Sequence, residues 1–274
     1  MKTKITIKDK KVCFLGAGNM AEALISGLID TKIIPRKNII ATDIKQERID
    51  YIKKKFSIEV SPNNLKSILK SDIIFIAVKP QQIDTLLSEI ENKINSKQLV
   101  ISIVTGITVE YINKYLPAVP VIRIMPNTPA LIREGIFVVC SGKYVKKSHE
   151  KIVKEMLNKI GIVIFEQENK FDTVTAISGS GPAYVFYIAE SMIKIATEFG
   201  LDPEISRTIV NQIIFGAGKM LKMSSDTADI LRQKVTSPGG TTEQAIKCFE
   251  EKGLFSILHE AIERAKNRAT ELTK

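Results

Sequence analysis

The sequence predicts an α/β protein whose N-terminal part is a doubly wound parallel sheet and whose C-terminal part is all-helical. The first 165 or so of its 274 residues alternate short apolar runs with segments of helical periodicity. One of those runs, Ile73 to Ile76, is apolar at every position, as in a strand that is buried on both faces of a parallel sheet. Beyond Lys170 no convincing strand follows. Strands that alternate with helices form parallel βαβ units, so these observations favour a doubly wound sheet.

The individual elements follow from hydrophobic periodicity and from the turn residues between them. The expected strands, in chain order, cover residues 12–15, 38–42, 58–60, 72–78, 99–104, 119–124, 135–139 and 161–165. The expected helices of the same part cover residues 20–29, 46–56, 62–69, 81–94, 109–115 and 146–159.

The second part of the chain contains helix signals only. Asp202 followed by Pro203 is typical of a helix start, with aspartate as the N-cap and proline at the first helical position. The expected helices there cover residues 182–199, 203–223, 226–234, 242–252 and 255–272. We therefore predict two domains, an α/β domain over residues 1–170 and a helical domain over residues 171–274.

The net charge and the composition limit the kinds of molecule that this protein is expected to bind. Lysine and arginine number 40 against 30 aspartate and glutamate residues, which gives a formal net charge of +10. This is typical of binding to nucleic acid or an anionic membrane, or simply of a lysine-rich soluble surface. The basic residues are spread along the chain, aromatic residues make up only 6% and there is no Trp, so we expect no nucleic-acid partner. No apolar run approaches about 18 residues, so we expect no membrane partner.

The cysteines and histidines are few and scattered. Cys13, Cys140 and Cys248 form no CxxC motif, which favours reduced thiols and a cytoplasmic location, and the N-terminus lacks the apolar segment of a secretory signal. His149 and His259 lie apart from every motif discussed below. We therefore expect neither a Ser–His–Asp triad nor a metal site.

The first expected strand runs into a glycine-rich turn. Gly16–Ala21 reads Gly-Ala-Gly-Asn-Met-Ala, a GxGxxA variant of the dinucleotide-binding fingerprint of Rossmann folds. Gly16 would permit the tight turn, Gly18 would let the backbone approach a pyrophosphate, and the small Ala21 would let the helix pack close to the strand. The helix N-terminus would then offer free N–H groups to the phosphates. The alternative is an ordinary glycine turn.

Asp43 ends the second expected strand. An acid at this position usually accepts a hydrogen bond from the adenosine ribose 2′-hydroxyl and disfavours a 2′-phosphate, so it favours NADH over NADPH. Lys45 and Arg48 follow closely and could still neutralise a phosphate. The alternative is that Asp43 is only the N-cap of the following helix.

Four further motifs lie at expected strand ends or helix starts, where open α/β sheets bind ligands. They are Ala-Val-Lys-Pro at 77–80, Met-Pro-Asn-Thr-Pro at 125–129, Ser-Gly-Ser-Gly-Pro-Ala at 178–183 and Thr-Ser-Pro-Gly-Gly-Thr-Thr at 236–242. Lys79 is either a charge for phosphate or substrate, or a solvated lysine. Gly239 and Gly240 place bare backbone amides before a helix, which suits a carboxylate, or else form an ordinary helix cap. With no central histidine base, the motifs suit a nicotinamide enzyme whose acceptor is already activated, such as an imine.

Taken together in this order, the motifs resemble those of pyrroline-5-carboxylate reductases over residues 11–272. The resemblance implies reduction of (S)-1-pyrroline-5-carboxylate by NADH or NADPH to L-proline, the last step of proline biosynthesis. It also implies a helical domain that interlocks with a second copy in a homodimer, which is often assembled into a decamer. Residues Met1 to Asp9 look like an extension before the usual start.

The resemblance also implies roles for individual residues. The cofactor contacts fall on Leu15, Gly16, Ala17, Gly18, Asn19, Met20, Asn64, Ala77, Val78, Lys79 and Pro80. The substrate loop falls on Ser237, Gly239, Gly240, Thr241 and Thr242. Thr242 matches the hydroxyl near the pyrroline nitrogen, whereas the family often has alanine in place of Thr241. Asp43 departs from the serine or asparagine of NADPH-preferring members.

Two other function classes stay open at this point. One is a reductase of another cyclic imine or carbonyl acid on the same scaffold. The other is a nicotinamide-binding protein without catalytic activity. The complete substrate-side motifs argue against both.

Overall fold

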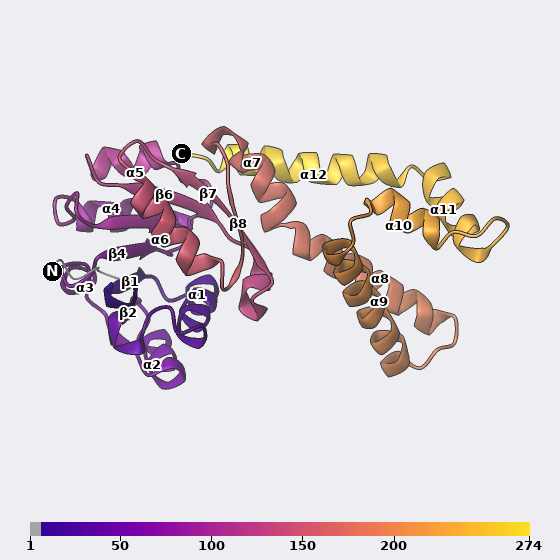
Figure 1. Cartoon of the computed structure of the whole chain (residues 1–274), viewed down its shortest axis with the longest axis horizontal. Helices are drawn as coiled ribbons and strands as arrows, with labels where there is room; N and C mark the ends of the chain where they lie inside the picture. The colour runs from indigo at the N-terminus through magenta and orange to yellow at the C-terminus, as the bar shows by residue number, and fades with distance from the viewer. Residues whose placement is uncertain (1–6) are drawn as a thin grey trace. The chain divides into compact units, whose positions relative to one another are not determined.

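The computed structural model describes residues 7–274, which divide into two compact units. One unit runs to Ser180 and resumes at Ala265–Lys274, and the other is Gly181–Arg264 (Figure 1). The last residues belong to the first unit because they bind it: the Lys274 amide donates to the Gly106 carbonyl at 2.7 Å and the Thr270 hydroxyl to Asp172 at 2.8 Å. Of the expected N-terminal extension, residues 1–6 lie outside the described residues.

The first unit is built on a sheet with the strand order β3-β2-β1-β4-β5-β6-β7-β8. Its strands are β1 Val12–Leu15, β2 Ile39–Thr42, β3 Glu59–Ser61, β4 Ile73–Ile76, β5 Leu99–Ser102, β6 Val121–Met125, β7 Gly135–Ser141 and β8 Gly161–Phe165. The order reverses direction at β1 and β4, so the carboxyl ends of these two strands border the crevice where open α/β sheets bind ligands.

Helices cover both faces of this sheet, which confirms the expected doubly wound α/β class. They are α1 Asn19–Asp30, α2 Gln46–Phe56, α3 Asn64–Ile68, α4 Ile83–Ile90, α5 Val109–Tyr115, α6 Lys147–Leu157 and the short α7 Phe171–Val174. Side chains alternate along β1: Val12 and Phe14 pack with α1, α2 and α6, and Cys13 and Leu15 pack with α3, α4 and α5. Strands covered on both faces require the continuous apolar runs seen in the sequence.

Two strands, β7 and β8, depart from the expected parallel arrangement and run opposite to β1–β6. β7 pairs antiparallel with β6, whereas every other neighbouring pair in the sheet is parallel. The connection between them contains only the 3₁₀ turn Thr128–Ile132. A parallel crossover needs a dozen or more residues, so this short connection can only turn the chain back.

The second unit is helical throughout. It contains α8 Gly181–Glu198, α9 Pro203–Met223, α10 Ala228–Lys234, α11 Thr241–Glu251 and most of α12 Leu254–Glu271. The Asp202 carboxylate caps α9 as expected, accepting the amides of Glu204 at 2.9 Å and Ile205 at 3.2 Å. Among the described helices, none combines the length and the apolar character needed to cross a membrane.

Candidate functional site

The glycine turn after β1 requires its first glycine. Gly16 has φ +94°, and its amide donates to the Thr42 carbonyl at 3.0 Å. A Cβ atom at this position would lie 2.7 Å from the Ala77 carbonyl oxygen, which is closer than real Cβ contacts. The turn therefore needs glycine both for its left-handed backbone and for the close approach of the strand β4 end.

Gly18 has a different role. It is the N-cap of α1 with an ordinary extended backbone, φ −66° and ψ −178°. A Cβ atom there would meet nothing within 4 Å. The protein itself does not require glycine at this position, so the open space beside the N-terminus of α1 is available to a ligand, as the dinucleotide fingerprint predicts.

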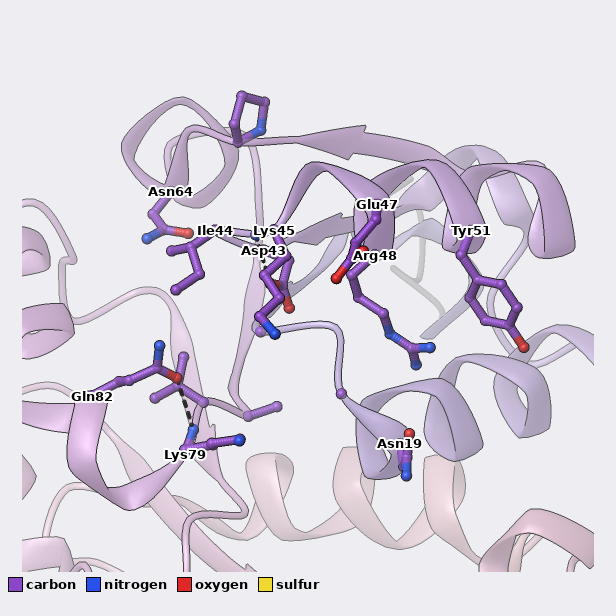
Figure 2. Close-up of a pocket in the computed structure, with 15 residues that line it drawn as sticks. Asn19, Asp43, Ile44, Lys45, Glu47, Arg48, Tyr51, Asn64, Lys79 and Gln82 are labelled. Carbon is purple, nitrogen blue, oxygen red and sulfur yellow. Dashed lines mark hydrogen bonds between the residues drawn. The ribbon is translucent and has the colours of Figure 1, made fainter.

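A pocket of about 580 Å³ opens beside this turn (Figure 2). It is lined by Gly16, Gly18, Asn19, Asp43, Ile44, Lys45, Glu47, Arg48, Tyr51, Pro62, Asn64, Ala77, Val78, Lys79 and Gln82. The residues come from the segments that follow the carboxyl ends of β1, β2, β3 and β4 and from α2. This volume and this position suit part of a dinucleotide.

The pocket brings together most of the cofactor residues expected from the sequence. Four of those residues do not line it: Leu15, Ala17, Met20 and Pro80. Leu15 and Ala17 are buried, so they act through their backbone and packing. The pocket also includes side chains that were not among the expected contacts, namely Ile44, Glu47, Tyr51, Pro62 and Gln82. The hydrophobic pattern gives no signal for them, because they lie on the loops and helix starts that only the folded sheet brings together.

Asp43 lies at the end of β2 and holds the glycine turn. Its carboxylate accepts the amide of Ala17 at 3.0 Å through one oxygen and the amide of Lys45 at 3.0 Å through the other. The alternative role as an N-cap is wrong: α2 begins at Gln46 after Lys45, and no side chain caps it. Asp43 therefore ties the β2–α2 loop to the glycine turn after β1 and still has lone pairs for a ligand hydroxyl.

Asn64, another residue that lines the pocket, is held in a fixed orientation. The Thr42 hydroxyl donates to its amide oxygen at 2.6 Å, and its amide nitrogen donates to Glu89 at 2.8 Å. Lys79 is exposed at the pocket rim, where Figure 2 shows it beside Gln82, whose side-chain oxygen accepts the Lys79 amide at 3.3 Å.

The expected substrate loop lies in the second unit, at the start of α11. Gly239 has φ +71° and Gly240 is the N-cap of the helix. Both glycine amides already have acceptors: Gly240 donates to the Ser237 carbonyl at 3.0 Å and Gly239 to the Glu243 carboxylate at 2.8 Å. The next amides, of Thr241 and Thr242, belong to the first helical turn, whose N–H groups have no acceptor within the helix.

Glu243 is the residue that the sequence reasoning missed in this loop. It stands at the third helical position, where glutamate commonly reaches back to a backbone amide before the helix. That spacing is a sequence signal and could have identified it. Its contact with Gly239 shows that this turn accommodates a carboxylate oxygen.

Comparisons with known proteins match both parts of the chain. Residues 168–272 match the family model described as pyrroline-5-carboxylate reductase dimerisation, and residues 11–106 match the one described as NADP oxidoreductase, coenzyme F420-dependent. Pyrroline-5-carboxylate reductase 1 of Bacillus spizizenii is 36% identical over 100% of this chain and 95% of that protein. The chain belongs to the pyrroline-5-carboxylate reductase family.

Other pyrroline-5-carboxylate reductases are also similar to this chain over nearly its whole length. The one from Methanosarcina acetivorans is 35% identical over 98% of this chain and 100% of that protein. The structure of the one from Coxiella burnetii superposes with a TM-score of 0.90 at 35% identity, covering 97% of this chain and 99% of that chain. The structure of Plasmodium falciparum pyrroline carboxylate reductase with NADP bound superposes with a TM-score of 0.89 at 30% identity. The match covers 97% of this chain and 99% of that chain.

Membership of the pyrroline-5-carboxylate reductase family makes this chain an oxidoreductase that uses a nicotinamide cofactor, and it contains the family's dimerisation region. The pocket residues fit such a cofactor. Gly18 leaves open space at a helix N-terminus for phosphates, and Ile44, with 77% of its surface exposed, offers an apolar contact at the same pocket.

A substitution at Gly18 separates cofactor binding from folding in this reductase. We expect Gly18→Ala to bind NADH roughly tenfold more weakly, because its methyl group takes the space left for the pyrophosphate, a cost of about 1.4 kcal/mol. The thermal midpoint should fall by at most a few degrees, since the backbone there suits alanine and only the weaker N-cap preference of alanine opposes the change. Titration of NADH fluorescence and thermal unfolding measure the two effects, with Gly16→Ala as a destabilised comparison. Unchanged NADH affinity in Gly18→Ala would contradict this assignment of the loop.

Proposed function

We propose that this chain reduces (S)-1-pyrroline-5-carboxylate to L-proline, the last step of proline biosynthesis, with hydride from NADH. The observation that supports this most directly is full-length membership of the pyrroline-5-carboxylate reductase family in a chain with both a dinucleotide turn and a Ser-Pro-Gly-Gly-Thr-Thr loop. A direct test is the reverse reaction at high pH, in which L-proline should be oxidised faster with NAD⁺ than with NADP⁺. Turnover confined to other cyclic imines or carbonyl acids would instead support a different reductase on this scaffold.

The preference for NADH rests on the side chains at the end of β2. Asp43 places a carboxylate and Ile44 an exposed apolar side chain where the adenosine ribose would lie. A 2′-phosphate would meet the Asp43 charge. Of the two nearby cations, Arg48 is engaged by the Glu22 carboxylate, which leaves the side chain of Lys45 as the better-placed positive charge. Because the Asp43 carboxylate repels a 2′-phosphate and Arg48 is already paired, these side chains favour the ribose hydroxyl of NADH over the 2′-phosphate of NADPH.

The cofactor and substrate contacts follow from this proposal. Phosphates of the cofactor would lie on the amides of Gly18, Asn19 and Met20 at the start of α1. The substrate carboxylate would lie on the start of α11, where the amides of Thr241 and Thr242 face the ligand and the Gly239 amide becomes available if Glu243 moves. When bound, NADH supplies the hydride for the imine carbon.

Thr242 would orient the substrate ring. We place its hydroxyl at the ring nitrogen, where it fixes which face of the imine is presented. An alcohol has no pKa suited to protonating an imine, so Thr242 is not a general acid. The proton that converts the imine to the more reactive iminium would enter with the substrate or from water. The chain therefore contributes orientation and anion binding.

Glu243 should oppose substrate binding. Its carboxylate accepts the Gly239 amide at 2.8 Å and so competes with an anionic substrate for the same turn. We expect Glu243→Gln to lower KM for pyrroline-5-carboxylate by about two- to fivefold with little change in kcat, which corresponds to a modest hydrogen-bond difference. Steady-state kinetics at saturating NADH measure this, with Glu250→Gln on the same helix as a control. A raised KM would show that Glu243 shapes the loop instead.

The second unit would form the homodimer. Large apolar side chains are exposed on α8, α9 and α12 and directly after α8. They include Phe186, Tyr187, Phe199, Phe215 and Phe255, at 63–85% of their full surface. A soluble chain rarely leaves so much apolar surface in water, so a second copy is the expected cover. We propose a homodimer through this unit, able to assemble into a decamer.

The cysteines fit the proposed cytoplasmic location. Cys13 and Cys140 are buried and all three thiols are free. Burial raises the pKa of the Cys13 thiol to about 12 and that of Cys140 to about 11, so both stay protonated and unreactive at neutral pH.

A further inference from the structure

The glycine turn Gly16–Gly18 is fixed by hydrogen bonds to the amide and to the carbonyl of one residue, Ala17. Ala17 lies between the two glycines of the turn, and its amide donates to Asp43 at 3.0 Å. Its carbonyl accepts a hydrogen bond from Nε of Arg48 on α2. Ala17 itself is buried and does not line the pocket. The two side chains therefore fix the turn from behind and leave its ligand-facing side open.

Arg48 is in turn fixed by Glu22 on α1. A second nitrogen of its guanidinium donates to the Glu22 carboxylate, so one planar group bridges the turn and the helix that follows it. The Arg48 guanidinium also stacks 4.8 Å from the centre of the Tyr51 ring, and Figure 2 shows both side chains extending from α2 alongside each other. The side chains of Arg48 and Glu22 are only 22% and 12% exposed.

Glu22 has three partners on α2. Besides Arg48, its carboxylate accepts the Tyr51 hydroxyl at 3.0 Å and the Lys55 ammonium at 2.7 Å. Burial raises the pKa of this carboxyl, but the hydrogen bonds from Lys55, Arg48 and Tyr51 outweigh burial and hold the pKa below its ordinary value. Glu22 is therefore ionised at neutral pH and keeps Arg48 in place.

We propose that Arg48, held by Glu22, is a positioning residue that keeps the Ala17 peptide in the shape that binds the cofactor pyrophosphate. Without it, a turn containing two glycines would sample many backbone conformations and would lose that freedom on binding. The inference rests on the proposed use of this pocket by the cofactor. It concerns the shape of the turn and does not depend on whether NADH or NADPH is preferred.

Removal of the Glu22 charge tests this proposal, because the two possible roles of Glu22 predict opposite changes in cofactor affinity. It lies in the first turn of α1, close to where the phosphates would bind, so its negative charge alone would weaken the binding of an anion. Removing that charge should tighten binding if Glu22 acts only through its field. Removing it should weaken binding if Glu22 acts by holding Arg48.

The experiment measures the Kd of ADP and NADH by calorimetry for Glu22→Met, Arg48→Gln, Arg48→Lys and the double variant Glu22→Met/Arg48→Gln. Each single variant should raise both Kd values by about fivefold or more, and the double variant should be no weaker than Arg48→Gln because the two residues act as one unit. Arg48→Lys keeps the charge but lacks the planar fork that places one nitrogen at Ala17 and another at Glu22, so it should not keep wild-type binding. At saturating NADH, the loss in kcat should be small beside the rise in KM for NADH, whereas a general loss of structure would lower kcat as well.

Lys53→Gln is the matched control, because it removes an exposed positive charge from the same helix and does not line the pocket. Its effect on both Kd values should stay within about twofold, as for an exposed charge. Equal or tighter ADP binding by Glu22→Met would overturn the proposal, and so would a loss in Lys53→Gln as large as in Arg48→Gln. If the wild-type chain bound neither ADP nor NADH, both the assignment of the pocket and the role of Arg48 would be wrong. If the wild-type chain bound both and the variants bound them equally well, only the role of Arg48 would be wrong.

Discussion

Replacing Thr242 with alanine should lower kcat/KM for pyrroline-5-carboxylate by about 10- to 100-fold, the range expected for one hydrogen bond to a charged group. Thr242 is the second residue of α11, next to the glycine turn that we assign to the substrate carboxylate. Loss of its hydroxyl would leave the ring nitrogen without a fixed partner. The Kd of NADH should be unchanged, because the pocket by the glycine-rich turn of the first unit does not include this residue.

Thr241→Ala provides the matched control for this prediction. It removes the same group one position earlier on the same helix, and we assign no substrate contact to the Thr241 hydroxyl, so kcat/KM should stay close to wild type. Thr242→Ser keeps the hydroxyl and should recover most of the activity. If Thr242→Ala had wild-type kinetics, or if Thr241→Ala lost as much activity, Thr242 would have no part in orienting the substrate.

Replacing Asp43 with serine should raise the ratio of kcat/KM with NADPH to that with NADH by roughly 10- to 100-fold. Two like charges a few ångströms apart near a protein surface repel by about 4 kcal/mol at most, and solvent at this open pocket reduces that value. Serine removes the repulsion of a 2′-phosphate and weakens the hold on the ribose hydroxyl of NADH. Kinetics with both cofactors at low and high salt measure the change.

Asp43→Ser should also weaken the binding of both cofactors somewhat, because the carboxylate supports the amides of Ala17 and Lys45. Asp43→Asn separates the two effects, since it removes the charge and keeps one acceptor oxygen at nearly the same place. A ratio that stays the same in both variants would show that Asp43 only supports the turn and does not choose the cofactor.

Local patterns were sufficient to predict the elements that carry the site. The helix 46–56 and the helix 203–223 have the predicted bounds, because an amphipathic period is a short-range signal, to which Asp202 adds an N-cap for the second helix. The glycine turn was predictable for the same reason, since a left-handed backbone at Gly16 needs glycine whatever surrounds it.

Long-range contacts could not be predicted in this way. The antiparallel direction of β7 depends on which strand it pairs with, and a single strand's composition carries no such information. Glu22 and Arg48 look like ordinary surface charges in the sequence, 26 residues apart, and only the packing of α1 against α2 brings them together. The return of the last ten residues to the first unit likewise follows from contacts with Gly106 and Asp172 and not from helical periodicity.

We propose that this member of the pyrroline-5-carboxylate reductase family reduces (S)-1-pyrroline-5-carboxylate with a preference for NADH. The most direct measurement follows the loss of absorbance at 340 nm with (S)-1-pyrroline-5-carboxylate and either NADH or NADPH, with L-proline identified as the product. We predict proline formation with both cofactors and a higher kcat/KM with NADH. Cofactor binding without any oxidation by this substrate would contradict the proposed reaction, and a higher kcat/KM with NADPH would contradict the role given to Asp43.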